Sequence, residues 1–93
     1  MGQHAIVPTP LDCPRDELAE ALLGLPGPIL IAAVAERLDH ARHLHLRPVS
    51  LWREGLALEE SVYLPIAMRA SDALSRRYQR WHSAFTRRLE RAG

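Results

Sequence analysis

The chain has 93 residues, of which 47% are hydrophobic and 25% charged. It is therefore long enough for one small folded domain and too hydrophobic to be disordered. Its net charge is +1, from twelve basic residues, all arginine, and eleven acidic ones, which excludes a uniformly polycationic nucleic-acid binder. The charge is unevenly divided, because residues 1–46 hold three arginines and six acids (−3) and residues 47–93 hold nine and five (+4).

Cysteine content and hydropathy indicate a cytoplasmic protein without a membrane segment. The single cysteine, Cys13, excludes an internal disulfide and a cysteine-rich metal site. The longest uncharged run, residues 21–35, has fifteen residues and contains Pro26 and Pro28, so it is too short and too interrupted to span a bilayer. No basic stretch precedes an apolar segment at the N-terminus, and we therefore expect no signal peptide.

The composition favours helices, since fifteen leucines and thirteen alanines outnumber ten valines, isoleucines and threonines. Residues 1–11 carry no charge and contain Pro8 and Pro10, which predicts an extended arm. A first helix follows, with Asp12 or Cys13 as its N-cap and Gly24 as its stop. Its expected buried side consists of Leu18, Ala21, Leu22 and Leu25.

A second helix is predicted over residues 28–46. Pro28 suits its first turn, and Arg47 precedes Pro48, which disfavours helical geometry at that residue. The imidazole of His45 falls on the apolar face, so we expect it to be a hydrogen-bonded core histidine. The full apolar face consists of Leu30, Ile31, Val34, Ala35, Leu38, Ala41 and His45.

The middle of the chain is less clearly patterned. Ser50 can cap a short turn that Gly55 ends, and residues 56–64 fit a short helix. Pro65 must then either kink this helix or begin a new one. A strand through residues 62–64 is the alternative, but it has no evident pairing partner, so helix is favoured.

The last helix has the strongest pattern, beginning between Pro65 and Ser71 and ending near Arg91. Large apolar residues recur along it at a 4-3-4 spacing, which is typical of a packing seam. Such a seam belongs either to the core or to an interface with a partner or a second copy, and the sequence leaves both open. The seam consists of Leu74, Tyr78, Trp81 and Phe85.

A row of arginines accompanies this seam on one sector of the same predicted helix. It could follow the phosphates of DNA or meet an acidic protein surface. The plainer interpretation is a solvated face, or one that pairs with the acidic first helix of the same fold or of a dimer mate. The basic stripe consists of Arg69, Arg76, Arg80, Arg87 and Arg91.

Other constellations carry little chemistry. Glu36, His40 and His43 share a helical face, but they lack the compact His-Glu-x-x-His spacing of zinc hydrolases, and we predict no metal or other cofactor. Cys13 has no evident base or oxyanion site, so no catalytic role is expected and the chain is not predicted to be an enzyme. A helix-turn-helix over residues 51–62 is disfavoured because Glu59 and Glu60 would face phosphate.

These observations predict an all-α fold: a single helical domain over residues 12–93, with three to four helices and a long amphipathic C-terminal helix. A chain this small has a marginal core, which favours a homodimer. The expected function is that of a small non-enzymatic regulator or adaptor that acts by protein–protein interaction, for example by sequestering a transcription regulator. The alternative is a DNA-binding transcriptional regulator that uses the basic stripe.

Overall fold

Two prolines set where the first helices begin. The computed structural model describes residues 7–11 and 13–92. Helix α1 (Arg15–Leu23) follows Pro14 and helix α2 (Gly27–Ala41) follows Pro26, and both prolines have extended ψ angles of 150° and 144°. The N-cap of α1 is therefore Pro14 and not Cys13, while Asp12 lies outside the described residues. Gly24 ends α1 as expected, in a right-handed conformation.

Helix α2 ends at Ala41, five residues before its predicted end. Two short 3₁₀ turns follow, η1 (Leu44–Leu46) and η2 (Val49–Leu51), on either side of Pro48. Arg47 is extended, as a residue before proline should be, and its carbonyl accepts a 2.8 Å hydrogen bond from the Trp52 indole. Because the helical periodicity stops at Ala41, His45 is exposed, and the prediction of a core histidine there is wrong.

The middle of the chain forms one continuous helical rod. It consists of α3 (Trp52–Leu58), the π-helical turn η3 (Glu59–Tyr63) and α4 (Leu64–Ala70). The helix predicted here is confirmed, and it continues through Pro65, which follows the π-helical turn by two residues. Gly55 lies inside α3 and does not end a turn. A Cβ there would lie 2.8 Å from Leu44 Cδ1, so Gly55 permits the close approach of η1.

The chain reverses at Ser71, whose extended backbone (φ −162°, ψ 124°) separates α4 from α5 (Asp72–Ala92). The Ser71 hydroxyl accepts a 3.3 Å hydrogen bond from the Leu74 N–H and so caps α5. Helix α5 begins at Asp72, just after the predicted range for its start, ends within one residue of its predicted end and packs back along the rod. Arg69 belongs to α4, so the prediction that it continues the basic stripe along one helix is wrong.

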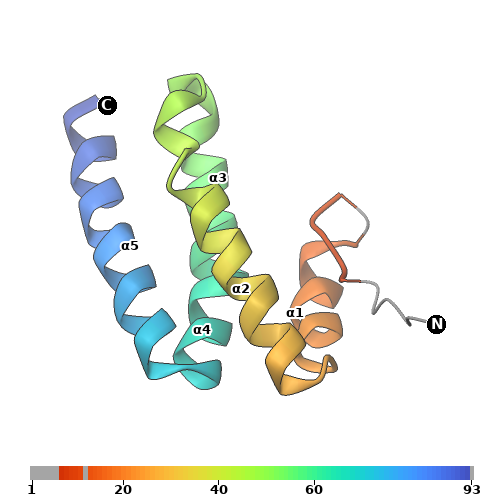
Figure 1. Cartoon of the computed structure of the whole chain (residues 1–93). Coiled ribbons are helices and arrows are strands. Elements are labelled where there is room, and N and C mark those ends of the chain that lie inside the picture. Colours follow the sequence, from red (N-terminus) through yellow and green to blue (C-terminus); the bar gives the residue numbers. More distant parts are fainter. Residues whose placement is uncertain (1–6, 12, 93) are drawn as a thin grey trace.

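The all-α arrangement is shown in Figure 1, where α2 lies beside the rod, with α5 on one side and α1 on the other. The predicted inner faces are confirmed only in part, since Ala21, Ile31 and Ala35 are exposed. None of the described helices is both long enough and apolar enough to cross a membrane. The main core cluster consists of Leu18, Leu22, Leu30, Val34, Leu38, Val62, Tyr63, Ile66, Ala67, Leu74 and Tyr78, and a smaller cluster consists of Trp52, Leu56 and Phe85.

Candidate functional site

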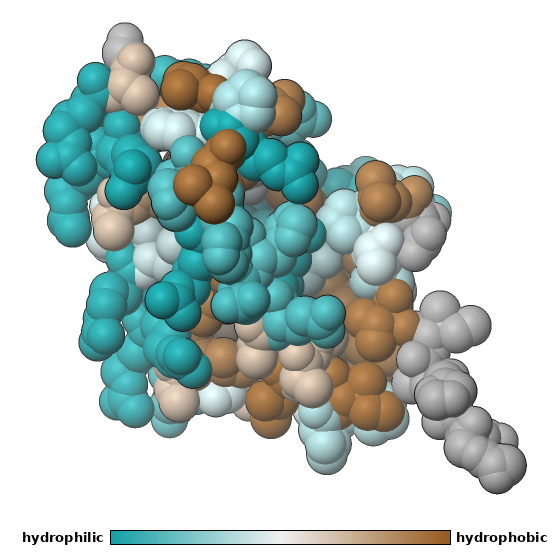
Figure 2. Space-filling view, turned by 45° about the horizontal axis from the view of Figure 1, so that its top comes forward, coloured by the Kyte–Doolittle hydropathy of each residue, from teal (hydrophilic) through white to brown (hydrophobic). Residues whose placement is uncertain are grey.

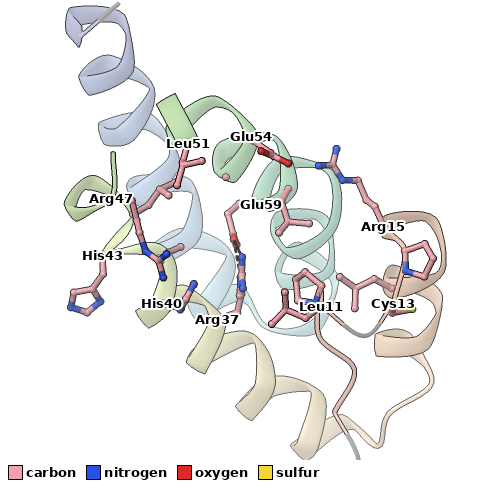
Figure 3. A pocket seen from close by; sticks show the side chains of 17 residues that line it. Leu11, Cys13, Arg15, Arg37, His40, His43, Arg47, Leu51, Glu54 and Glu59 are labelled. Atoms are coloured by element: carbon pink, nitrogen blue, oxygen red, sulfur yellow. Dashed lines mark hydrogen bonds and ion pairs between the residues drawn. The ribbon is translucent and has the colours of Figure 1, made fainter. Parts of the chain in front are cut away.

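A pocket of about 750 Å³ lies between α1, α2 and α3 (Figure 3). We call it the three-helix pocket. Every element around the pocket contributes apolar residues to its wall. The wall also includes Cys13, whose free thiol group is on a partly buried residue. The apolar lining residues are Pro10, Leu11, Cys13, Pro14, Leu18, Ala41, Leu44, Leu51, Gly55 and Leu58, and the polar ones are Arg15, Arg37, His40, His43, Arg47, Glu54 and Glu59.

The turn between α2 and α3 shapes one side of this pocket. The Trp52 indole holds the carbonyl of Arg47, which fixes the turn against the start of α3. Leu44 then lies over the bare backbone of Gly55, where any larger residue would displace its methyl groups. The pocket wall therefore depends on contacts between residues that lie close in space but in different elements.

The polar side of the pocket is predominantly basic. Arg37 is paired with Glu59. Arg15 and Arg47 have no acidic group within 4 Å among the described residues, and the pocket lining contains one further carboxylate, that of Glu54. Partial burial lowers the pKa of His40, and the positive charges of Arg37, Arg47 and His43 lower it further. The repulsion felt by a protonated His40 indicates a positive field at this rim, and such a field favours an anionic group.

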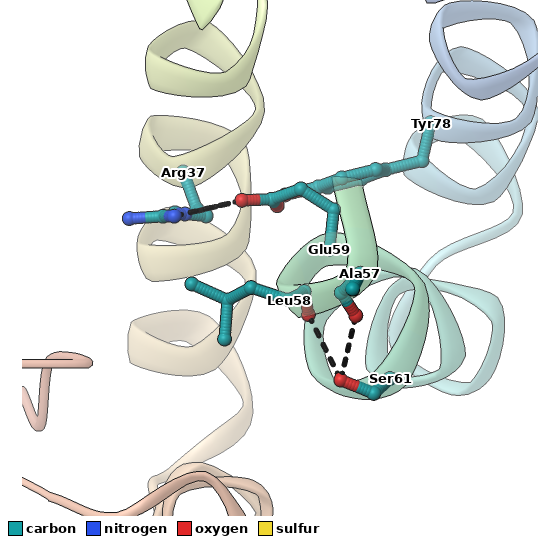
Figure 4. A network of polar contacts seen from close by, with 6 residues as sticks. All are labelled: Arg37, Ala57, Leu58, Glu59, Ser61 and Tyr78. Carbon is teal, nitrogen blue, oxygen red and sulfur yellow. Dashed lines mark hydrogen bonds and ion pairs between the residues drawn. The ribbon is translucent and has the colours of Figure 1, made fainter. Parts of the chain in front are cut away.

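A buried polar network borders the three-helix pocket through Arg37 and Glu59 (Figure 4). Glu59 is only 2% exposed, and its carboxylate accepts hydrogen bonds from Arg37 Nε at 2.8 Å and from the Tyr78 hydroxyl at 2.9 Å. The Arg37 guanidinium also lies 4.9 Å from the centre of the Tyr63 ring. These contacts join α2, the π-helical turn and α5, so the network positions the elements that surround the pocket.

Burial dominates the acid–base properties of this network. It raises the pKa of Glu59, while the charge and hydrogen bond of Arg37 and the hydrogen bond of Tyr78 oppose the rise. Burial, followed by the negative charge of Glu59, raises the pKa of Tyr78. Tyr78 therefore stays a neutral donor to the carboxylate.

Sequence reasoning missed Arg37 and Glu59 as paired residues. It considered Glu59 only as a group that would repel phosphate. The available signal is that Glu59, Val62 and Tyr63 stand at i, i+3 and i+4, and all three are buried. The partner could not be identified in this way, because Arg37 lies 22 residues away in the chain.

The seam residues lie inside the chain. Leu74, Tyr78 and Phe85 are buried, and Trp81 is partly exposed. The Trp81 and Phe85 rings stack at 5.4 Å with 28° between their planes, and Trp52 packs on Phe85 at the same distance. This burial within one chain favours the internal alternative for Leu74, Tyr78 and Phe85, and only Trp81 keeps part of its side chain exposed.

The rest of the predicted basic stripe is exposed on α5. Arg76, Arg80, Arg87 and Arg91 have no acidic side chain within 4 Å among residues 7–11 and 13–92. The described acids of α1 therefore do not pair with them within the chain, and pairing with the first helix of a dimer mate stays a prediction. In Figure 2, hydrophilic residues gather along the edge of the molecule formed by α5.

The possible metal ligands do not converge. Within the described part of the chain, no three histidine, cysteine, aspartate or glutamate side chains are grouped to hold a metal ion. His40 and His43 line the three-helix pocket, whereas Glu36 does not, and the His43 ring contacts the Asp39 carbonyl at 2.8 Å. These histidines therefore contribute polar and basic groups to the pocket rim.

No protein-family model, no curated protein and no solved structure matches this chain. Its function must therefore be inferred from the three-helix pocket and from the distribution of charge around it.

Proposed function

We propose that this chain is a small non-enzymatic interaction protein that holds a short apolar, acidic segment of a partner protein in the three-helix pocket. The observation that carries the proposal is the combination of an apolar wall with a basic rim in one large pocket. By occupying that segment the chain would act as a regulator or adaptor, for example by keeping a transcription regulator from its own target.

Exposed apolar side chains around the pocket support a macromolecular partner. Leu11, in its wall, is 98% exposed, and Leu51 on the opposite side is also exposed. Two further exposed apolar residues lie in the adjoining turns: Leu46 in η1, with 71% of its surface exposed, and Val49 in η2. Exposed apolar groups in the pocket wall and in the adjoining turns suit a chain segment that covers them, and each Å² removed from water contributes roughly 25 cal/mol.

The basic rim specifies the charge of the segment. Arg15 and Arg47 have no acidic partner within the part of the chain that the structure describes and can therefore meet carboxylates, and the positive charges near His40 have the same sign. Complementary charge of this kind sets orientation and association rate, while apolar burial supplies affinity. An acidic apolar segment is therefore expected to bind better than a basic one of equal hydropathy.

Compartment and assembly are part of the proposal. The single free thiol, Cys13, suits a reducing cytoplasm. A homodimer stays a prediction, and because most of the seam is buried it would have to use exposed apolar residues such as Leu23, Ile31 and Met68.

The test is an NMR titration of the isotope-labelled chain with three short synthetic peptides of matched hydropathy. One carries glutamates, one carries lysines in their place, and one has the residues in scrambled order. The acidic peptide should shift the amides of Leu44, Gly55 and Leu58. Arg47→Glu should weaken its binding about tenfold or more, because it reverses a charge of the rim. Arg53→Glu, an exposed charge reversal on α3 outside the pocket lining, should not.

Three results would overturn this proposal: no shift at the pocket amides, equal binding of the lysine peptide, or equal loss in the two variants. Shifts that grow with protein concentration alone would show that the occupant is a second copy of the chain. They would likewise contradict a partner segment.

Nucleic-acid binding through α5 is the second candidate. The observation that favours it is the set of exposed arginines from Arg76 to Arg91, which extends about 22 Å at 1.5 Å per residue and has no acidic partner among the described residues. Binding to duplex DNA should weaken steeply with salt, and replacing Arg76, Arg80 and Arg87 by alanine should flatten that dependence. Salt-independent or undetectable binding would exclude it.

A further inference from the structure

A second hollow, of about 300 Å³, lies between the end of α2 and the C-terminal half of α5. We call it the α5 groove. It shares no lining residue with the three-helix pocket. Its lining combines two kinds of side chain, aromatic or small residues on α5 and basic residues from both sides. These residues are Trp81, Ala84 and Phe85, together with Arg42, His45, Arg87, Arg88 and Arg91.

The charge of the α5 groove is unbalanced. Four guanidinium groups line it and no carboxylate does, and none of the four has an acidic group within 4 Å among the described residues. Arg87 and Arg91 stand at i and i+4 on one helix, where like charges repel. The unbound chain therefore carries a repulsion that an anion would relieve. Guanidinium forks match the oxygen geometry of phosphate better than a single point charge does.

The aromatic part of the α5 groove is held rigidly. Trp81 is partly exposed, and its ring stacks on Phe85, which in turn packs on buried Trp52. The ring of Tyr78 meets Trp81 edge-on at 6.2 Å. An indole fixed in this way loses little conformational freedom when a flat group packs against it, and aromatic side chains beside arginines are a common platform for nucleic-acid bases.

We propose that the α5 groove binds a nucleoside phosphate, with the phosphate held by Arg42, Arg88 and Arg91 and the base placed against Trp81. The size of the groove fits one nucleotide and not a duplex. The bound nucleoside phosphate can be a free nucleotide or one nucleotide within a single strand. This site is independent of the three-helix pocket, and it differs from the duplex-binding candidate because it requires contact with the base.

The test follows the two indole N–H signals and the Ala84 amide by NMR during titration with pyrophosphate, ADP, an oligothymidine single strand and a matched duplex. ADP should shift the Trp81 indole N–H signal and the Ala84 amide signal. It should leave the Trp52 indole N–H signal unchanged, because that group donates a hydrogen bond to the Arg47 carbonyl. ADP should also bind about tenfold more tightly than pyrophosphate, which is the scale of one stacked base.

Two double variants distinguish a specific binding site from a general electrostatic attraction to α5. Arg88→Ala with Arg91→Ala should lower ADP affinity about tenfold or more, on the scale of lost charged hydrogen bonds. The double variant Arg76→Ala with Arg80→Ala removes the same amount of charge from the same helix, but outside the groove. It should change ADP affinity less than about twofold. All four side chains are exposed, so folding should be retained, and thermal unfolding checks this.

Tighter binding of the single strand than of ADP, with the same indole shift, would assign the site to single-stranded nucleic acid. Equal or weaker binding would assign it to a free nucleotide. Both results agree with the proposal. It is overturned if pyrophosphate binds as tightly as ADP, if the two arginine pairs have equal effects, or if the Trp81 indole does not shift.

Discussion

The hydroxyl of Tyr78 donates a 2.9 Å hydrogen bond to Oε1 of Glu59, and so ties α5 to the π-helical turn of the neighbouring rod. Both side chains are almost fully buried, and the second carboxylate oxygen, Oε2, is held by Arg37. The carboxylate is therefore shared between a neutral donor and a cationic one.

Tyr78→Phe should reveal the contribution of the neutral donor. The ring and its packing are kept while the buried carboxylate loses one hydrogen bond, so the free energy of unfolding should fall by about 1–3 kcal/mol. Tyr63→Phe is the control, because the Tyr63 hydroxyl makes no hydrogen bond within the described residues and its removal should cost less than about 0.5 kcal/mol. Urea unfolding measures both, and equal losses would contradict the assigned role of the Tyr78 hydroxyl.

Glu59→Gln should change how stability depends on pH. Burial raises the pKa of Glu59 in the folded chain above its ordinary value of 4.5. The folded state then binds more protons than the unfolded state between these two pKa values, so this group makes stability fall as pH rises through that window. Relative to the wild type, the glutamine variant should gain stability as pH rises from 4.5 through the raised pKa of Glu59. Urea midpoints across this range test it, and a flat or opposite difference would refute it.

Gly55→Ala should separate pocket shape from stability. Alanine is favoured over glycine inside a helix by about 0.5–1 kcal/mol, but its Cβ must displace the methyl groups of Leu44. We therefore expect little change in the melting temperature and clearly weaker binding of the acidic peptide. Gly27→Ala is the control, since a Cβ there meets no atom within 4 Å. Unchanged peptide affinity in Gly55→Ala would show that Leu44 does not shape the binding surface.

Ser71→Ala should weaken the start of α5. It removes the hydroxyl that accepts the Leu74 N–H, and loss of such a cap costs about 0.5–2 kcal/mol. The bond is 3.3 Å long, so the lower half of that range is expected. Ser83→Ala, an exposed change within α5, should leave stability equal or slightly higher. Thermal unfolding compares the two, and a cost that is equal in both would argue against capping by Ser71.

Local sequence signals predicted the helices whose ends depend on local chemistry. Gly24 marks the end of α1, Pro28 lies in the first turn of α2, and the spacing around Tyr78 and Phe85 identified α5 and its inner face, whereas the N-cap of α1 is Pro14 and not Cys13. The end of α2 was predicted too late because apolar residues continue beyond Ala41, while the turn is fixed by a bond from the Trp52 indole.

The three-helix pocket could not be predicted in this way, since its geometry depends on contacts between separate elements. Gly55 was taken as a stop because glycine often ends helices, yet its role is to make room for Leu44. Glu59 was treated as a surface charge, but its burial depends on Arg37 and Tyr78, which lie 22 and 19 residues away. Periodicity reports which face of a helix is apolar and says nothing about which distant charge that face will meet.

The core is divided into two clusters, and from this division we expect the two halves of α5 to differ in mobility. Trp81 packs against both clusters, but beyond it the helix is anchored mainly by Phe85 and Leu89 against Trp52 and Leu56, whereas its first half packs on the large cluster. Opening of the C-terminal half therefore exposes much less apolar surface than global unfolding does. Amide hydrogens after Trp81 should exchange with solvent faster than those around Tyr78, and an anion in the α5 groove would slow this exchange by joining α5 to Arg42.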